Sequence, residues 1–298
     1  MARILCIGDI MLDVTALIGK EIQPGVEMRA KISTQGGGAA ANVASWLAAY
    51  KTPVFLVARV GDDAAGKTVI DELDQFGVEH SKTVISGART GVVIVLVDDL
   101  GERTMFPDSG ANAGLSPADL PPLDGFDAIY LSGYSLVNPQ SRAGILEIIN
   151  IAKSKRLPIL FDPSTVGVLL EVGVAKVREW LSFMDLILLN EEEAHFLTGM
   201  SNPVDAAADL LQFAECVVIK RGPIGALGQS RKSEKAIQVA ATPTTVVDTT
   251  GAGDAFAAGF IQIWSEGGEL IDALSRGAEL AGYCVAHIGS RPLVAPKD

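Results

Sequence analysis

Short apolar runs alternate with longer stretches of helical periodicity along most of this chain of 298 residues. The runs are nearly continuous in apolar side chains, which predicts strands buried on both faces of a sheet. They are Ile4–Gly8, Val54–Val60, Ala128–Leu131, Pro158–Phe161, Leu186–Leu189 and Cys216–Lys220. Helical spacing is found in Ala40–Tyr50, Gly66–Phe76, Gln140–Lys155, Gly173–Ser182, Glu191–Thr198, Val204–Phe213, Ala255–Gly267 and Leu270–Ile288. The alternation predicts an α/β fold whose mostly parallel central sheet is covered by helices on both faces.

Residues 10–35 and 91–108 depart from this rhythm, because they show strand-like alternation without a helical period. The second segment has apolar stretches on either side of Leu100-Gly101, which predicts a hairpin with its turn there. An antiparallel flap beside a parallel sheet is suited to covering a ligand. We therefore expect a single domain over residues 1–298, with these two segments inserted as a small β-lid.

Composition and charge argue against several classes of protein. Apolar residues make up 48% of the chain and the mean hydropathy is +0.32, which is typical of a globular protein. No apolar run approaches the ~20 residues of a membrane span. The first residues lack the layout of a signal peptide, so we expect a cytoplasmic protein. A net charge of −12 argues against nucleic acid or an anionic membrane as a partner.

The segment Val247–Phe256, Val-Asp-Thr-Thr-Gly-Ala-Gly-Asp-Ala-Phe, carries the most specific chemical signal. A turn of small residues ends in Asp254, and an apolar helix follows directly. The amides of Gly251, Ala252 and Gly253 are then free at a helix N-terminus, where the helix dipole favours an anion. Phosphoryl transfer to an alcohol needs both features, because the carboxylate takes the hydroxyl proton while oriented donors hold the phosphate charge. An Asp that only caps the helix is the alternative.

Two further segments favour the chemical interpretation. A glycine turn that starts at Gly36 leads through a predicted helix start to Asn42, and Asn190–Glu193 follows the buried run Leu186–Leu189. In this order and spacing, the three segments resemble the ribokinase or PfkB family of carbohydrate and nucleoside kinases over nearly the whole chain. The resemblance implies a ribokinase-like fold, ATP and Mg²⁺ as cofactors, and a lid over the sugar that often also serves as a homodimer surface.

The resemblance also implies roles for the residues around the phosphates. Asp254 would be the catalytic base, and Gly251, Ala252 and Gly253 would form the anion hole. Asn190 and Glu193 match the family's Asn-x-x-Glu, which organises Mg²⁺ and its waters. The implied nucleotide contacts are Lys220, Gly222, Gly225 and, beside the adenine, Gly282. A loop for a monovalent cation such as K⁺, which only some members use, would include Asp248, Thr250 and Gly289.

The sugar would be held from several elements. Asp13 matches the family's sugar-binding Asp, and a carboxylate accepts two hydroxyl hydrogen bonds well. Gly37 and Gly38 let the backbone approach the sugar, and Asn42 can both donate to and accept from its hydroxyls. Arg103 and Asp162 are expected where the lid and the strand ends converge. The pattern leaves open ribose, fructose, a keto-deoxy sugar acid, a phosphorylated hexose and a nucleoside. The aromatic content of 6% favours a free sugar over a nucleoside.

Two alternatives belong to other classes of protein. Gly61–Thr68 matches the P-loop pattern G-x-x-x-x-G-K-[ST] between a predicted strand and a helix, which would make the chain a P-loop NTPase. Asp62 and Asp63 argue against it, because like charges weaken a loop that wraps phosphates. A catalytically silent sugar-binding protein of the same fold would be favoured by loss of the base or the anion hole, and both are present.

Overall fold

The computed structural model describes residues 1–19, 22, 24–81, 83–99, 103–233 and 235–293. Within these ranges the largest sheet has nine strands, in the order β15-β14-β13-β12-β11-β10-β1-β4-β6. The strands from β13 to β6 run parallel, and β14 and β15 add an antiparallel edge. Their bounds are β1 Ile4–Ile7, β4 Val54–Val57, β6 Glu79–His80, β10 Ala128–Ser132, β11 Ile159–Asp162, β12 Leu186–Asn190, β13 Cys216–Lys220, β14 Ala226–Ser230 and β15 Ile237–Val239.

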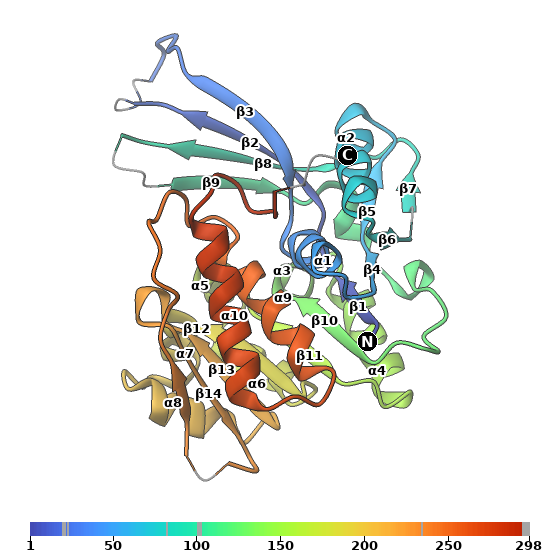
Figure 1. Cartoon of the computed structure of the whole chain (residues 1–298). Coiled ribbons are helices and arrows are strands. Elements are labelled where there is room, and N and C mark those ends of the chain that lie inside the picture. Colours follow the sequence, from blue (N-terminus) through green and yellow to red (C-terminus); the bar gives the residue numbers. More distant parts are fainter. Residues whose placement is uncertain (20–21, 23, 82, 100–102, 234, 294–298) are drawn as a thin grey trace.

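Helices cover both faces of this sheet, as predicted (Figure 1). Successive strand residues point to opposite faces, so that Ile4 and Cys6 of β1 enter one core while Leu5 and Ile7 enter the other. The first core is covered by α1 Ala39–Ala49, α2 Ala64–Phe76, α9 Ala252–Trp264 and α10 Leu270–Val285. The second is covered by α3 Gly133–Val137, α4 Arg142–Ser154, α5 Val166–Val172, α6 Val174–Leu181, α7 Glu191–Thr198 and α8 Pro203–Leu210.

The two predicted lid segments meet in a separate sheet of order β3-β2-β8-β9, which projects from the α/β body (Figure 1). β2 (Met11–Leu17) pairs antiparallel with β3 (Lys31–Gly37), and β8 (Gly91–Val97) pairs antiparallel with β9 (Arg103–Asp108). β2 and β8 run parallel, so the lid consists of two antiparallel pairs joined side by side. The turn predicted at Leu100-Gly101 lies outside the described residues.

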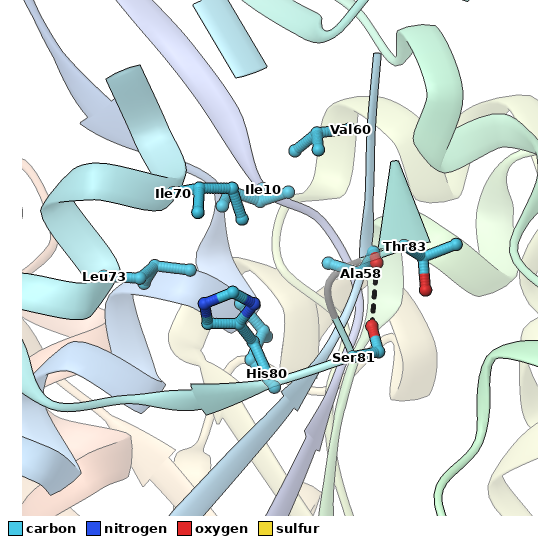
Figure 2. Close-up of a pocket in the computed structure, with 9 residues that line it drawn as sticks. Ile10, Ala58, Val60, Ile70, Leu73, His80, Ser81 and Thr83 are labelled. Atoms are coloured by element: carbon cyan, nitrogen blue, oxygen red, sulfur yellow. Dashed lines mark hydrogen bonds between the residues drawn. The ribbon is translucent and has the colours of Figure 1, made fainter. Parts of the chain in front are cut away.

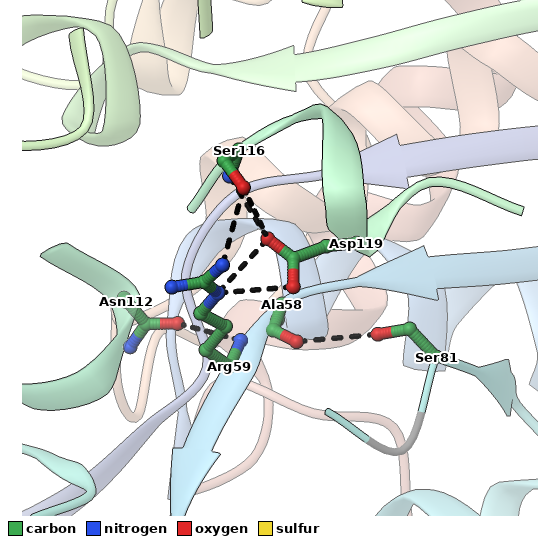
Figure 3. Close-up of polar contacts among 6 residues, drawn as sticks. All are labelled: Ala58, Arg59, Ser81, Asn112, Ser116 and Asp119. Atoms are coloured by element: carbon green, nitrogen blue, oxygen red, sulfur yellow. Dashed lines mark hydrogen bonds and ion pairs between the residues drawn. The ribbon is translucent and has the colours of Figure 1, made fainter. Parts of the chain in front are cut away.

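The predicted strand Val54–Val60 is divided in two. β4 ends at Val57, and the next strand, β5, leaves the main sheet to pair with β7. At the break the Ala58 carbonyl accepts a hydrogen bond from Ser81, and the Arg59 guanidinium forms an ion pair with Asp119 (Figure 3). These partners lie 23 and 60 residues away, so local patterning could not predict the break. The bounds are β5 Arg59–Gly61 and β7 Thr83–Ile85.

Helix ends lie within a few residues of prediction, with two differences that matter. α9 begins at Ala252 rather than Ala255, which places Asp254 in its first turn. A separate short helix, α5, precedes the predicted helix at Gly173, where the backbone changes direction with a φ of 88°. None of the helices in the described ranges is long and apolar enough to cross a membrane.

Candidate active site

Polar side chains converge where neighbouring parallel strands end. The residues are Asp9 after β1, Ser132 at the end of β10, Asp162 of β11, Asn190 of β12 and Lys220 of β13. The carboxyl ends of parallel strands meet at one edge of a sheet, where α/β proteins bind ligands. Four of these positions follow apolar strands that the sequence predicted, so the convergence is a direct consequence of strand order.

The first turn of α9 lies at this edge and carries the predicted anion hole. Gly251 is the N-cap residue with a φ of 75°, a left-handed conformation that a residue with a side chain rarely adopts. A Cβ at Gly251 would also lie 2.5 Å from the Ser290 Cα. In the described part of the chain the amides of Gly251 and Gly253 have no acceptor, while the Ala252 amide donates to the Thr249 carbonyl at 3.3 Å. The turn therefore presents unpaired N–H groups beside Asp254.

Lys220 brings a positive charge to the same turn. Its Nζ donates to the Asp162 Oδ2 at 2.6 Å, and both side chains are largely buried. A Cβ built on Gly253 would lie 3.5 Å from the Lys220 Nζ, so the absence of a side chain at Gly253 leaves the ammonium beside the free amides. Charge and amide donors thus converge on one point, which suits a phosphate group.

Burial and like charges shift the titration of the carboxylates at this edge. Burial raises the pKa of Asp254 to about 8, a rise that Asp162 and Asp9 support and that Asn42 and Lys220 oppose. Burial likewise raises the pKa of Glu193 to about 7, with a further contribution from Asp162. Burial alone lowers the pKa of Lys220, but Asp162 and Glu193 outweigh it and keep the pKa above its ordinary value. A carboxyl with a pKa near neutrality is typical of a general base.

Asn190 and Glu193 form the capping box of α7. The Asn190 amide N–H and side-chain Nδ2 donate to the two Glu193 carboxylate oxygens at 2.8 and 2.9 Å, and the Glu193 amide donates to the Asn190 Oδ1 at 2.8 Å. Among the described residues no group of three or more His, Cys, Asp or Glu side chains is placed to hold a metal. One or two carboxylates together with nucleotide phosphates are sufficient for Mg²⁺, so Glu193 and Asp162 fit a phosphate-bound ion.

The predicted sugar-binding residues lie together on the lid side of the edge. A Cβ on Gly37 would lie 2.3 Å from three carboxyl atoms of Asp13, so this glycine makes room for that side chain. Burial raises the pKa of Asp13 to about 7, and Arg291 opposes the rise. Gly38 is the N-cap of α1 with a φ of 93°. The Asp9 carboxylate accepts from the Ala39 amide and the Ser132 hydroxyl, whereas among the described residues the Asp13 carboxylate accepts no hydrogen bond.

Asn42 joins the two halves of the site, since its Nδ2 donates to the Asp254 Oδ2 at 2.9 Å. Its Oδ1 accepts from Ser290 and from Arg291, each at 3.3 Å, and the Arg291 guanidinium pairs with Glu72 at 2.9 Å. Sequence reasoning missed both Arg291 and Glu72. The one sequence feature linked to them is Gly36, because the absence of a side chain there leaves the space that Arg291 and Glu72 fill.

Arg103 contacts the loop that leads into the anion-hole turn, and its predicted role in sugar binding stays a prediction. It forms an ion pair with Asp248 and a hydrogen bond of 3.4 Å to the Thr249 hydroxyl. The Asp248 carboxylate also accepts from the Thr250 amide and hydroxyl and from the Gly289 amide, and these hydrogen bonds hold its pKa below the usual range although burial opposes them. The Asp248 carboxylate of this loop is thus engaged by internal donors, and the monovalent cation stays a prediction.

The predicted nucleotide loop follows β13. Gly222 opens a short 3-10 helix over Gly222–Ile224, and Gly225 ends it. A Cβ at Gly225 would lie 2.0 Å from the Val239 carbonyl oxygen, whereas nothing lies within 4 Å of one at Gly222. A Cβ at Gly282, in α10, would lie 2.7 Å from the Cβ of Thr242 in a neighbouring loop. The loop, Lys220 and Asp162 thus lie at the same end of β13.

The P-loop interpretation of Gly61–Thr68 is wrong. The Asp63 carboxylate caps α2 through the Gly66 amide at 2.8 Å and also accepts from the amide and the hydroxyl of Thr90. Asp62 accepts from the Gly87 amide. The Lys67 ammonium is exposed and pairs with Asp71 of the same helix. A carboxylate occupies the place where a P-loop presents amides to phosphate, so this segment is a capped helix start.

A small cavity lies beside this helix, between residues of α2, β4 and β6 (Figure 2). It measures about 10 Å³ and is lined mainly by apolar side chains, with His80, Ser81 and Thr83 at one side. A volume of this size holds a single water at most. His80 contacts Asp74 through its Nε2 at 3.1 Å, which makes it a structural link between β6 and α2.

Comparison with known proteins agrees with this geometry. The family model described as pfkB family carbohydrate kinase matches residues 1–297. The ATP-dependent ribose-1-phosphate kinase of Halopiger xanaduensis is 30% identical, over 98% of this chain and 93% of its own length. The structure of Arabidopsis thaliana ribokinase complexed with ribose and ATP has a TM-score of 0.83 at 27% identity, covering 99% of this chain and 97% of that one. Adenosine kinase from Sinorhizobium meliloti has a TM-score of 0.88 at 23% identity, covering 98% and 96%.

The chain therefore belongs to the pfkB family of carbohydrate kinases. The predicted ribokinase-like fold and the predicted enzyme class, an ATP-dependent carbohydrate kinase, are confirmed. The individual residue roles rest on the geometry given above.

Proposed function

We propose that Asp254 takes the proton from a sugar hydroxyl while the amides of Gly251, Ala252 and Gly253 stabilise the charge on the phosphate that ATP transfers to it. One observation carries the proposal. A carboxyl whose pKa is raised to about 8 and a set of unpaired amides lie in the same helical turn. The first removes the hydroxyl proton, and the second holds the negative charge as it develops.

The remaining phosphate contacts follow from the strand ends. Lys220 lies beside Gly253 and would pair with the transferred phosphate, while Asp162 holds its ammonium in place. Asn190 and Glu193, with Asp162, would hold Mg²⁺ against the phosphates. When bound, the ion neutralises phosphate charge and aligns the chain of phosphates. Gly222 and Gly225 would let the loop after β13 follow the nucleotide, and Gly282 would lie near its base.

The acceptor is a sugar with neighbouring hydroxyls. The Asp13 carboxylate, beside the backbone of Gly37 and Gly38, is suited to accept hydrogen bonds from two of them. Asn42 lies between this carboxylate and the base. Relatives at 29–31% identity are named ATP-dependent ribose-1-phosphate kinase, ribokinase and fructokinase. Pentoses, pentose phosphates and fructose are therefore the first substrates to test.

The lid supplies a surface for a second copy of the chain. Leu17, Ile32, Ile94, Met105 and Phe106 are exposed apolar side chains on its four strands, and Ile32 is 65% exposed. Apolar side chains gathered on one small sheet favour an interface, so the proposal includes a homodimer through the lid. It also places the enzyme in the cytoplasm, where ATP is available.

The test is ADP release with Mg-ATP across pentoses, hexoses, pentose phosphates, sugar acids and nucleosides. We expect turnover that depends on one of the sugars and falls by about 10²–10⁴-fold in Asp254→Asn, because that is the usual contribution of a general base. ATP binding, followed by calorimetry, should survive in this variant. Lys67→Ala is the matched control and should keep wild-type rates. Turnover that persists in Asp254→Asn would overturn the assignment of the base.

A further inference from the structure

A single buried guanidinium connects the base to the sugar side of the site. Arg291 follows α10, and its side chain is only 7% exposed. Its Nε donates to the Asn42 Oδ1 at 3.3 Å, its Nη1 to the Glu72 carboxylate at 2.9 Å and its Nη2 to the Gly37 carbonyl at 3.1 Å. These partners come from α1, α2 and the end of β3, so one side chain fixes three elements.

The space for this side chain is built into the backbone. A Cβ on Gly36 would lie 2.2 Å from the Arg291 Nη1 and 2.3 Å from the Glu72 Oε2. The Gly36 amide instead donates to that same Glu72 oxygen at 2.8 Å. Burial lowers the pKa of Arg291, and Glu72 and Asp13 oppose this fall. A charge buried in this way is stable only when it is paired and hydrogen-bonded, so the pocket is organised around Arg291.

The contact with Asn42 decides which way its side-chain amide faces. A carboxamide has an acceptor oxygen at one end and a donor nitrogen at the other. Arg291 and Ser290 both donate to the Asn42 Oδ1, which leaves the Nδ2 to donate to the Asp254 Oδ2 at 2.9 Å. The reversed amide would set its nitrogen against two donors and its oxygen against the Asp254 carboxylate.

We propose that Arg291 is a positioning residue that orients the Asn42 amide so that its Nδ2 donates to the Asp254 carboxylate. The inference rests on the proposed role of Asp254 as the base. It adds a residue that touches neither the reacting hydroxyl nor the phosphate and acts through another side chain.

The charged and titratable groups around Asp254 act in both directions. Asp162 and Asp9 disfavour its ionisation, and Lys220 and Arg291 favour it. The neutral titratable groups that it influences are Tyr130, Tyr134 and Cys284. Lys220 is already committed to Asp162, so the Asn42 hydrogen bond is the largest influence that lowers the pKa of Asp254. Loss of the orienting guanidinium therefore raises that pKa further, and the acid limb of the rate moves to higher pH.

The experiment is the pH dependence of kcat and kcat/KM with the best sugar, for wild type, Arg291→Gln and Arg291→Lys. We expect the acid limb of Arg291→Gln to move up by about one pH unit, which gives a roughly tenfold loss near pH 7 and a much smaller one near pH 9.5. Arg291→Lys keeps the positive charge but lacks the forked N–H donors of a guanidinium. Its acid limb should therefore lie between those of wild type and Arg291→Gln.

Arg276→Gln is the matched control. Arg276 also donates to a side-chain amide oxygen, that of Gln262 at 3.0 Å, and also pairs with a glutamate, Glu279 at 2.7 Å. Gln262 lies two turns of α9 beyond Asp254. The control therefore removes the same two kinds of contact, a hydrogen bond to an amide oxygen and an ion pair, at a distance from the site. Its pH profile should match that of wild type.

Ser290→Ala keeps the test decisive if Arg291→Gln fails to fold. It removes the other donor to the Asn42 Oδ1 and should shift the acid limb in the same direction by a smaller amount. Folded variants whose rates fall equally at every pH would overturn the inference and leave Arg291 a structural residue. A wild-type protein with no sugar-dependent turnover would instead overturn the proposed function, so the two failures are distinguishable.

Discussion

The guanidinium of Arg103 on lid strand β9 forms an ion pair with Asp248, in the loop that leads into the anion-hole turn. The two residues are 145 positions apart in the chain, and both are partly buried. The lid is thereby fastened to the segment whose amides receive the phosphate. A change in lid position is consequently a change at Asp248, Thr249 and Thr250.

We expect Arg103→Gln to lower kcat/KM by about 10-fold or more, because the lid loses its ion pair with the loop that positions the anion-hole turn. Wild-type turnover should be the same in K⁺ and in tetramethylammonium, since Asp248 already has an internal cation. K⁺ should restore part of the activity of the variant and raise its melting temperature. Strong activation of the wild type by K⁺ would contradict this account.

The pH profile of the wild type tests the state of the base. The folded pKa of Asp254 is about 8, and catalysis needs the ionised carboxylate, so kcat/KM should fall about tenfold per pH unit below it. Stopped-time assays of ADP release from pH 6 upward measure this limb. A profile that stays level below neutrality would mean that a different group takes the proton.

Asp254→Asn should make the folded protein more stable at alkaline pH. The folded pKa of Asp254 lies above its ordinary value of 3.8, so the folded state retains a proton that the unfolded state releases. The stability of the wild type therefore falls as pH rises from about 4 to about 8, and Asn removes that loss. We expect the variant to melt ~2 °C or more above wild type at high pH, and the difference to vanish at low pH.

Asp272→Asn is the control for this stability measurement. Asp272 also lies in the first turn of a helix, α10, but it is exposed. The melting temperature of Asp272→Asn at high pH should equal that of wild type, because water solvates the Asp272 carboxylate in the folded and in the unfolded protein. An equal gain in both variants would assign the effect to helix charge rather than to burial.

Asp63→Ala should reduce stability without reducing catalysis. The substitution removes the cap of α2 and the two hydrogen bonds from Thr90, and loss of such a cap costs about 1–2 kcal/mol. Urea unfolding measures the change, and the kcat of the folded variant should equal that of the wild type. A selective loss of ATP turnover here would revive a nucleotide role for Gly61–Thr68.

Gly37→Ala should raise the KM for the sugar about 10-fold or more and leave the KM for ATP unchanged, since its methyl group would displace the Asp13 carboxyl. Gly167→Ala is the matched control, because its Cβ would meet nothing closer than 3.9 Å. Steady-state kinetics with each substrate varied in turn separates the two constants. Equal increases in the KM for the sugar and the KM for ATP would mean that Gly37 supports packing and not sugar binding.

The sequence predicted those parts of the molecule that local patterning determines. β13 and α7 have their predicted bounds, Cys216–Lys220 and Glu191–Thr198, because a continuous apolar run and a capping box are local signals. The segment around Asp254 was informative for the same reason. The break of the strand at Ala58 was not predictable, because it depends on Asp119, 60 residues from Arg59. Arg291 was missed likewise, since its partners Asn42 and Glu72 lie 249 and 219 residues away.

The hydrogen bonds that join Asn42 to Asp254 and to Arg291 span 212 and 249 residues, so they connect segments that are far apart in the polypeptide. During synthesis, α1 leaves the ribosome long before α9 exists. The Asn42 side chain is therefore made early in synthesis, but its hydrogen bonds to Asp254 and Arg291 form only after both later segments have been added.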